Sequence, residues 1–427
     1  MNASERHPRL SFFAALAMIV ILEVRCTPSG QLIDENNMIE EMLEKHRDLF
    51  GTVLDHLEKY QVQILYTQID RDENNFPSFR SYRFRVDSTM YFYPASAVKL
   101  PAAILALEKL NDLNVRGLNR DTPLRIDSAY ADQTGVVADS TSETGLPSVG
   151  HYIKKIFLVS DNDAFNRLYE FLGQQELNET LWKKGFKDLR IIHRLSVFNT
   201  PDQNRYTNPV TFYTESGPVY EQPLVYNQNM YNKEPGSILR GDGYILGDSL
   251  IRAPKDFSFS NFISVEDLQG ILKAVLFPEA ASERERFNLT DDDYRYLYSS
   301  MSMLPRESRY PAYDSLEYYD SHGKYFLFGD SKRPIPLDIR IFNKVGQAYG
   351  FLIDNAYVVD LERGVEFLLS AVVYVNENQI FNDDKYEYDQ VGMPFLANLG
   401  RVIYEYESQR KRLHSPNLEK FRIDYRN

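Results

Sequence analysis

The sequence predicts an α+β fold, with one antiparallel sheet built from both ends of the chain, flanking helices and a mostly helical lobe beside it. Strand-like alternation of apolar and polar residues occurs early, at 62–70 and 79–86. It returns only late in the chain, at 339–343, 350–360 and 366–375. Helical spacing of apolar residues dominates between them. Strands bury their apolar faces by joining a sheet, so the two sets are expected to pair across the length of the chain.

The expected helices lie around and between these strands. The first covers 38–60, where Glu and Lys occupy the face opposite the apolar residues. Pro101 fits a helix over 98–113 because it falls near the first turn, where a missing N–H is tolerated. Further helical patterns cover 151–172, 264–277 and 392–406.

Two long stretches of the middle, around 200–260 and 279–338, are rich in Pro, Gly, Asn, Asp and Tyr. They show no repeat and no low-complexity pattern, so they are expected to be ordered insertions. We predict a single domain over 38–427 that carries both of them. The acidic run 291–293 lacks the alternating ligands and central glycine of a calcium loop, and it is expected to form a solvated turn.

Composition and charge narrow the class of protein. Hydrophobic residues make up 43% and charged residues 26% of the chain, which is ordinary for a globular protein. The formal net charge of -13 argues against a nucleic-acid partner, because nucleic acids are bound by basic surfaces. The histidines show no metal-binding spacing, and we predict no metal and no cofactor. His151, His193 and His322 are expected in structural or surface positions.

The N-terminus has the pattern of a targeting segment. Basic residues precede an apolar run at 10–24, which is short for a membrane span and fits the core of a signal peptide over 1–25. The single cysteine of the chain, Cys26, follows at once and resembles the lipid-attachment cysteine of a bacterial lipoprotein. Polar residues 26–37 are then a tether. We expect a lipid anchor on Cys26 in a bacterial cell envelope, at a periplasmic or surface location. Plain secretion, an uncleaved anchor and an incidental thiol are the alternatives.

The first candidate for chemistry is Ser96 with Lys99. A serine hydroxyl needs a base to remove its proton before it attacks a carbonyl carbon. The i,i+3 spacing places both side chains on one helix face if Ser96 opens the helix. Lys99 must then be neutral, and burial together with the charge of Lys344 would lower its pKa. An isolated Ser-x-x-Lys is weak evidence, since a helix-capping serine and a surface lysine give the same pattern.

Two further motifs follow in the chain. In the Ser160-Asp161-Asn162 loop, Ser160 is placed to carry a proton to a leaving group, and Asn162 is placed to hold a substrate amide. A plain helix-capping turn is the alternative. In Lys344-Val345-Gly346, Lys344 is placed to bind a substrate carboxylate, and Gly346 would let a substrate backbone approach the strand. An edge-strand lysine that deters aggregation is the alternative.

The ordered combination is far more specific than any one motif. Residues 93–101 resemble the active-site helix start of class A β-lactamases and penicillin-binding serine hydrolases. Residues 158–164 resemble the second motif of these proteins, and 343–346 with the strand that follows resemble the third. The resemblance implies the serine β-lactamase and D,D-peptidase type of fold. It also implies an oxyanion hole formed by the N–H of Ser96 and of Gln347 or Ala348, with donors typically worth ~3 kcal/mol.

The chain departs from this family at a loop after the second motif. Class A β-lactamases carry a glutamate there, which activates the water that releases the acyl group. In the matching segment, 193–199, Leu195 falls at that place and cannot accept a proton. Asp202, Glu215 and Glu221 are the carboxylates that might substitute.

A second departure lies in the third motif. Val345 replaces a threonine whose hydroxyl binds the substrate carboxylate in the family. Losing one such hydrogen bond costs roughly 1–3 kcal/mol of affinity. Both departures leave acylation of the serine intact and remove parts used for fast release.

The resemblance therefore implies an envelope serine hydrolase that forms an acyl-enzyme on Ser96 with a β-lactam or a related amide or ester, and it makes efficient β-lactamase activity doubtful. The substrate would be a small molecule or a peptidoglycan-like compound. A non-catalytic ligand-binding protein on the same fold is the first alternative. A D-Ala-D-Ala peptidase, which needs no loop glutamate, is the second.

Overall fold

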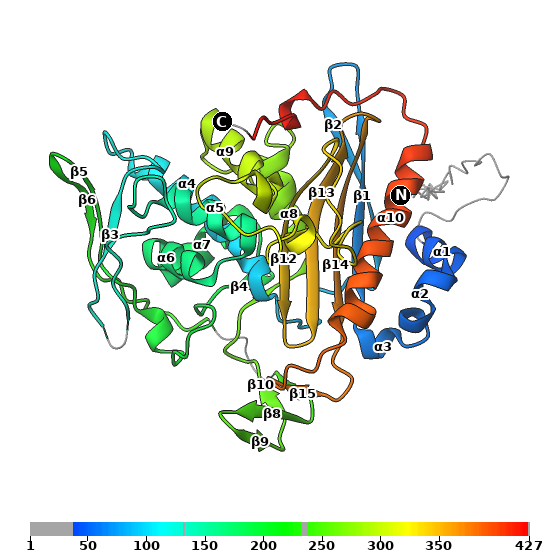
Figure 1. The fold of residues 1–427 in the computed structure, drawn as a ribbon, viewed down its shortest axis with the longest axis horizontal. Coiled ribbons are helices and arrows are strands. Elements are labelled where there is room, and N and C mark those ends of the chain that lie inside the picture. Colours follow the sequence, from blue (N-terminus) through cyan, green and yellow to red (C-terminus); the bar gives the residue numbers. More distant parts are fainter. Residues whose placement is uncertain (1–36, 131–132, 232–237, 426–427) are drawn as a thin grey trace, which may run out of the picture.

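The computed structural model describes residues 37–130, 133–231 and 238–425 (Figure 1). Three layers are visible: helices on one face of a central sheet, the sheet itself, and helices with a larger lobe on the other face. The predicted signal peptide, Cys26 and all but the last residue of the predicted tether lie outside the described residues. Within the described residues no helix is both long and apolar enough to cross a membrane.

The central sheet confirms the predicted fold class. Its five strands are antiparallel throughout and join the two ends of the chain, because β14 pairs with β1. In spatial order they are β12 (Ile339–Ala348), β13 (Phe351–Asp360), β14 (Val365–Tyr374), β1 (Gln63–Arg71) and β2 (Pro77–Phe84). Every residue of β13 and β14 is buried, which explains why these strands have nearly continuous apolar sequences.

The outer face of the sheet is covered by helices from both chain ends, around one apolar core. The predicted helix over 38–60 is in fact three helices that change direction at His46 and at Asp55–His56. Neither break contains Gly or Pro, so the apolar spacing alone suggested continuity. The helices are α1 (Met38–Lys45), α2 (Arg47–Leu54), α3 (Leu57–Tyr60) and α10 (Met393–Gln409).

The inner face packs against the helical lobe through a second, larger core. The predicted helix over 151–172 is two helices, because Ser160 adopts a left-handed conformation with φ of 59°. Asp161 then caps the next helix by accepting a hydrogen bond from the Ala164 N–H at 2.8 Å. The inner helices are α4 (Lys99–Leu113), α5 (Val149–Val159), α6 (Asn162–Leu172), α7 (Gln174–Lys184), α8 (Val265–Leu276) and α9 (Asp291–Ser302).

The prediction of a solvated turn at 291–293 is wrong. These aspartates form the first turn of α9, and Thr290 and Asp293 cap its N-terminus reciprocally. The positive end of the helix dipole stabilises carboxylates there, so the acidic run is a helix start.

The rest of the middle forms short elements. The short strands are β3 (Leu124–Ile126), β4 (Leu189–Arg190), β5 (Val210–Thr214), β6 (Gly217–Gln222), β7 (Leu239–Arg240), β8 (Gly243–Leu246), β9 (Ser249–Ile251), β10 (Lys255–Asp256), β11 (Phe262–Ile263) and β15 (Ile380–Phe381). Single helical turns are η1 (Ala95–Val98), η2 (Gln203–Arg205), η3 (Pro305–Glu307), η4 (Asp320–Gly323), η5 (Tyr388–Gly392) and η6 (Glu419–Phe421). Of these, η1 and η4 border the candidate site.

Candidate active site

Ser96 lies on the single turn η1, at the N-terminal end of the buried helix α4. The residue before it, Ala95, has a φ of 48°, a left-handed conformation that is strained for a residue with a side chain. Ser96 is half-buried, and its backbone N–H meets no acceptor within the described part of the chain. That free N–H fits the predicted role of an oxyanion donor.

Lys99 is fully buried, and its Nζ lies among four oxygen atoms of the first two motifs. Nζ is 2.8 Å from Ser96 Oγ, 3.2 Å from Ser160 Oγ and 2.6 Å from Asn162 Oδ1. It also donates to the main-chain carbonyl of Ser160. The left-handed conformation of Ser160 is what brings this carbonyl and the Asn162 side chain to the same point.

The two carbonyl-type partners of Lys99 can only accept hydrogen bonds. A neutral amine has two N–H groups, and the Ser160 carbonyl with Asn162 Oδ1 uses both. The nitrogen lone pair is then left for the hydroxyl proton of Ser96. Burial, and next the charge of Lys344, hold the pKa of Lys99 well below its ordinary value, although Asp161 opposes the shift. The neutral, proton-accepting form of Lys99 is therefore favoured more than it is in an exposed lysine.

Lys344 approaches the same point from β12. Its Nζ donates to Ser160 Oγ at 2.9 Å and to its own strand at the Val345 carbonyl at 3.0 Å. The Ser160 hydroxyl thus lies between the two lysine side chains and can pass a proton from one to the other. Burial lowers the pKa of Lys344 to about 7, and the charge of Lys324 adds to the shift while Asp354 opposes it.

A third buried lysine stands behind Lys344 and was not anticipated from the sequence. Lys324 Nζ donates to the Met301 carbonyl and, at 2.6 Å, to Asn343 Oδ1. Burial lowers its pKa to about 7. The Asn343 amide in turn donates to Asp354 Oδ1 at 2.8 Å. Lys324 follows η4 in an irregular segment, where no periodic pattern marks a residue as buried.

A cavity of about 710 Å³ opens over these groups. Three of the predicted residues line it at its reactive end: Ser96, Ser160 and Asn162. Val345 and Gln347 line it from β12, whereas Lys99, Lys344 and Gly346 lie behind its wall. Aromatic and polar side chains make up most of the remaining wall: Tyr93, Ser196, Tyr319, Ser321, His322, Tyr325, Tyr349, Asn382, Asp384, Tyr386, Tyr388 and Asp389. Segment 279–338, predicted as an insertion, therefore reaches the cavity directly.

Gly346 has a packing role in addition to the one predicted. A Cβ atom on this residue would lie 2.4 Å from the Pro94 carbonyl and 3.3 Å from the Ala97 nitrogen. The missing side chain lets η1 lie directly against β12. Gln347 and Ala348 line the cavity with Ser96, and their N–H groups stay candidates for the oxyanion hole. Contacts of Lys344, Gly346 and Gln347 with a substrate stay predictions.

Leu195 lies in the cavity wall, where it is 5% exposed. Its main chain is held on both sides by Asn166: the Leu195 N–H donates to Asn166 Oδ1 at 2.9 Å, and Asn166 Nδ2 donates to the Leu195 carbonyl at 3.0 Å. The next residue, Ser196, accepts a hydrogen bond from Asn162 Nδ2 at 2.7 Å. A leucine is therefore fixed on this side of the site.

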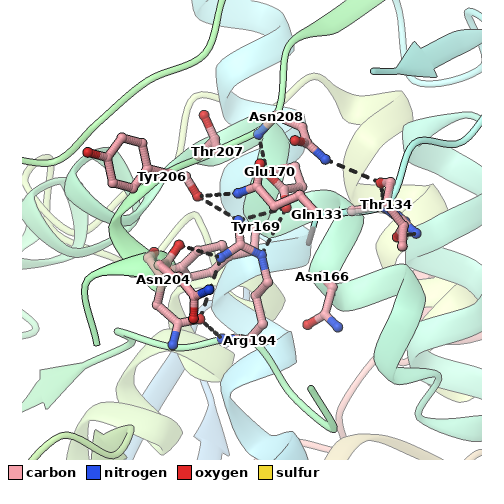
Figure 2. A network of polar contacts seen from close by, with 12 residues as sticks. Gln133, Thr134, Asn166, Tyr169, Glu170, Arg194, Asn204, Tyr206, Thr207 and Asn208 are labelled. Atoms are coloured by element: carbon pink, nitrogen blue, oxygen red, sulfur yellow. Dashed lines mark hydrogen bonds and ion pairs between the residues drawn. The ribbon is translucent and has the colours of Figure 1, made fainter. Parts of the chain in front are cut away.

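Figure 2 shows the polar network that fixes the loop carrying Leu195. Arg194 donates through Nε and Nη2 to Glu170 Oε1 of α6, at 2.8 and 2.7 Å, and this pair is buried. The other oxygen of Glu170 accepts from the Asn208 N–H, and Arg194 Nη2 also donates to the Tyr206 carbonyl at 2.6 Å. Both ends of the loop are thus tied to one buried carboxylate.

The carboxylates proposed to replace the missing glutamate lie elsewhere. Asp202 pairs with Arg205 at 3.1 Å, Glu215 lies in the exposed turn between β5 and β6, and Glu221 is exposed on β6. None of the three lines the cavity. Asp384 and Asp389 do line it, at an exposed rim.

His322 differs from its predicted position, because it lines the reactive cavity. Among the described residues, no group of three or more His, Cys, Asp or Glu side chains is arranged to hold a metal ion. The arrangement as a whole can deprotonate a serine hydroxyl, stabilise an oxyanion and carry a proton through Ser160.

Residues 50–229 match the model of the beta-lactamase enzyme family. That part of the chain resembles the family. The matched range contains the first two motifs, so the predicted family resemblance is confirmed, and it supports a hydrolase-type enzyme in general terms. A comparison with curated proteins finds no match.

The solved structures that resemble this chain are distant in sequence. A β-lactamase from Sphaerobacter thermophilus has 12% identity and a TM-score of 0.46, with 88% of this chain and 97% of that chain covered. A β-lactamase from Streptomyces albus G has 15% identity and a TM-score of 0.46, with 85% and 99% covered. A structure titled PBP-A has 13% identity and a TM-score of 0.45, with 84% and 95% covered.

Glu170→Gln is expected to lower the free energy of unfolding by about 3–5 kcal/mol, because it leaves the Arg194 guanidinium buried without a counter-charge. Urea denaturation measures this loss. Asp163→Asn on the same helix is the matched control, since Asp163 is an exposed partner of Arg167 and its removal should cost about 1 kcal/mol or less. Equal losses in the two variants would contradict the proposed importance of the buried pair.

Gly346→Ala is expected to slow modification of Ser96 at least about tenfold, because the added methyl group displaces η1 and with it the nucleophile. The rate of labelling by a fluorophosphonate measures it. Gly51→Ala, at a helix position where the nearest atom to a new Cβ is 3.9 Å away, is the control and should label at the native rate. A native rate in Gly346→Ala would contradict the tight contact.

Lys344→Met is expected to move the acid limb of Ser96 labelling to higher pH. The Lys344 charge lowers the pKa of Lys99, so removing it raises that pKa, and Lys99 stays protonated and inactive to higher pH. The midpoint of the rate against pH, measured with an uncharged fluorophosphonate, is independent of carboxylate binding. Lys324→Met, one lysine further from Lys99, should shift it less. An unmoved midpoint in Lys344→Met would contradict the coupling.

Proposed function

We propose that this protein is a serine hydrolase that uses Ser96 to form an acyl-enzyme with a β-lactam or a related amide or ester. The observation that carries the proposal is the arrangement of Lys99, whose two N–H groups are taken by carbonyl-type acceptors while Nζ lies 2.8 Å from Ser96 Oγ. A lysine held in this way keeps its nitrogen lone pair free to accept a proton from the nearest hydroxyl, which is that of Ser96.

In the proposed acylation, Lys99 takes the hydroxyl proton as Ser96 Oγ attacks the carbonyl carbon. The N–H groups of Ser96 and of Gln347 or Ala348 stabilise the oxygen that becomes negative. Ser160 Oγ, within 3.2 Å of Lys99 and 2.9 Å of Lys344, returns a proton to the leaving nitrogen or oxygen. The product is an ester between Ser96 and the acyl group.

A binding protein without catalysis is a weaker explanation of the same site. Each buried lysine with a lowered pKa costs folding free energy at neutral pH, because the unfolded chain holds that proton more tightly. Lys99, Lys344 and Lys324 all carry this cost. A protein that only binds its ligand gains nothing from a neutral lysine beside a serine.

A D-Ala-D-Ala peptidase is the second candidate function. The buried Leu195 in the cavity wall favours it, because such a peptidase needs no carboxylate at that place. A location in the bacterial cell envelope, with a lipid on Cys26, remains part of the proposal and would bring a peptidoglycan-like substrate within reach. Release of D-alanine from a cell-wall pentapeptide separates this candidate from a hydrolase of β-lactams.

Ser96→Ala is expected to abolish covalent labelling by a fluorescent penicillin and by a fluorophosphonate, because no nucleophile remains beside Lys99. Mass spectrometry of the intact protein should show one adduct on the native chain and none on the variant. Hydrolysis of nitrocefin should fall by at least about a thousandfold.

Ser160→Ala is the comparison that tests the proton path. It keeps the nucleophile and the base, so labelling should persist at a reduced rate. Equal nitrocefin turnover in native protein and Ser96→Ala would remove Ser96 from the mechanism. A native chain that no acylating probe modifies would favour the binding protein.

A further inference from the structure

Resting on the proposed function, we infer that His322 is the general base that activates the water for release of the acyl group, in the place of the carboxylate that Leu195 replaces. The inference concerns the second half of the reaction, for which the loop around Leu195 offers no proton acceptor. Three observations support it: the position of His322, the absence of a hydrogen bond from its ring nitrogens to any described residue, and the way its turn is held.

His322 lies on η4, which is placed between the two elements that carry Ser160 and Lys344. On one side, the next residue, Gly323, lies against the last turn of α5, where a Cβ on it would be 3.9 Å from the Phe157 carbonyl. On the other side, Asn343 Nδ2 of β12 donates to the Gly323 carbonyl at 2.9 Å. His322 therefore lines the same cavity as Ser96 and Ser160.

The turn that carries His322 is anchored at both ends. Asp320 at its start accepts from Arg306 Nε at 2.7 and 2.9 Å and from the Ile335 N–H at 2.8 Å. The hydrogen bond from Asn343 to Gly323 holds its end. A base that must meet a water molecule at one position needs such a rigid support.

The His322 imidazole is positioned by two tyrosine rings, and its nitrogens can exchange a proton with water. Tyr318 and Tyr319 contact it edge-on, with ring centroids at 5.1 and 6.0 Å. Within the described residues, no hydrogen bond is made by either ring nitrogen, so both are available to water. A structural histidine in a packed core would normally use them.

The charges around His322 favour the neutral, basic form. Burial lowers its pKa below the ordinary value, and the Lys344 charge across the cavity wall adds to this, while exposed Glu317 on its own segment opposes it. At pH 7 most of the imidazole is then unprotonated, as a base requires. Asp384 and Asp389 lie at the exposed rim of the same cavity.

The proposed step balances as an ester hydrolysis. A water molecule attacks the carbonyl carbon of the acyl–Ser96 ester from the side of Ser160 and Lys344, and His322 takes one of its protons. The bond from that carbon to Ser96 Oγ breaks, and the proton on His322 returns to Oγ by way of the Ser160 hydroxyl and Lys99, which is neutral in the acyl-enzyme. The acid product leaves, and His322 and Lys99 are both neutral again.

The test separates acylation from release. Native protein, His322→Gln, Asp384→Asn and Asp389→Asn are labelled with a fluorescent penicillin, excess label is removed, and loss of label from Ser96 is followed. His322→Gln should acylate within about twofold of the native rate and release its label about 100-fold more slowly. The two aspartate variants are matched controls in the same cavity and should release at the native rate.

Two further readouts distinguish a base from a structural residue. Added imidazole should restore release in His322→Ala, which a mere loss of packing would not permit. In the native protein, release should rise with pH and then level off, with the midpoint of the rise below pH 6.5, the ordinary pKa of histidine. That profile is measured on unmodified protein, so it stays decisive if the variants fold poorly.

Native-rate release from folded His322→Gln, or a release rate independent of pH between 4.5 and 7, would overturn this inference alone. A hundredfold loss in Asp384→Asn or Asp389→Asn instead would assign the base to that aspartate. Absence of any label on native Ser96 would overturn the proposed function together with this step.

Discussion

The candidate site depends on the burial of three lysine side chains at one junction between the sheet and the helical lobe. Lys99 comes from α4, Lys344 from β12, and Lys324 from the segment after η4. Their charges repel one another through a medium of low dielectric constant, so full protonation of all three is costly. Buried Asp354 is the carboxylate that opposes the pKa shifts of both Lys324 and Lys344.

The junction offsets this cost with oxygen atoms that only a correctly assembled fold brings together. Lys99 meets the α5–α6 connection, Lys324 meets the end of α9, and Lys344 meets Ser160. Each contact joins elements that are far apart in sequence. The same packing explains the glycine at position 346. Because Gly346 has no side chain, the Pro94 carbonyl, just before η1, can lie directly against it. The contacts that affect the protonation of these lysines are therefore also contacts that hold the elements of the site together.

The sequence predicts those parts of the molecule that repeat a simple pattern. Strand alternation near both ends was enough to predict the five-stranded sheet, and the fixed order of three motifs was enough to bring Ser96, Lys99 and Ser160 together. Periodicity is silent where the chain changes direction without Gly or Pro, so the breaks at His46 and Asp55–His56 were missed. It is equally silent in irregular segments. In the sequence, nothing distinguishes Lys324 from a surface lysine. Only the structure shows that its Nζ donates to Asn343 and to the Met301 carbonyl.

The irregular segment 303–338, between α9 and β12, also supplies part of the cavity wall. On the side of the 191–208 loop, the buried Arg194–Glu170 pair fixes the loop that places Leu195 in the cavity wall. The turn η4 and the residue before it contribute Tyr319, Ser321 and His322 to the same cavity, and Asp320 anchors this turn to Arg306. A water molecule beside an acyl ester can be activated from either side of the carbonyl plane. Leu195 offers no proton acceptor on one part of the cavity wall, whereas His322 on another part has ring nitrogens that can accept a proton, so the inferred release of the acyl group would proceed from the side of η4.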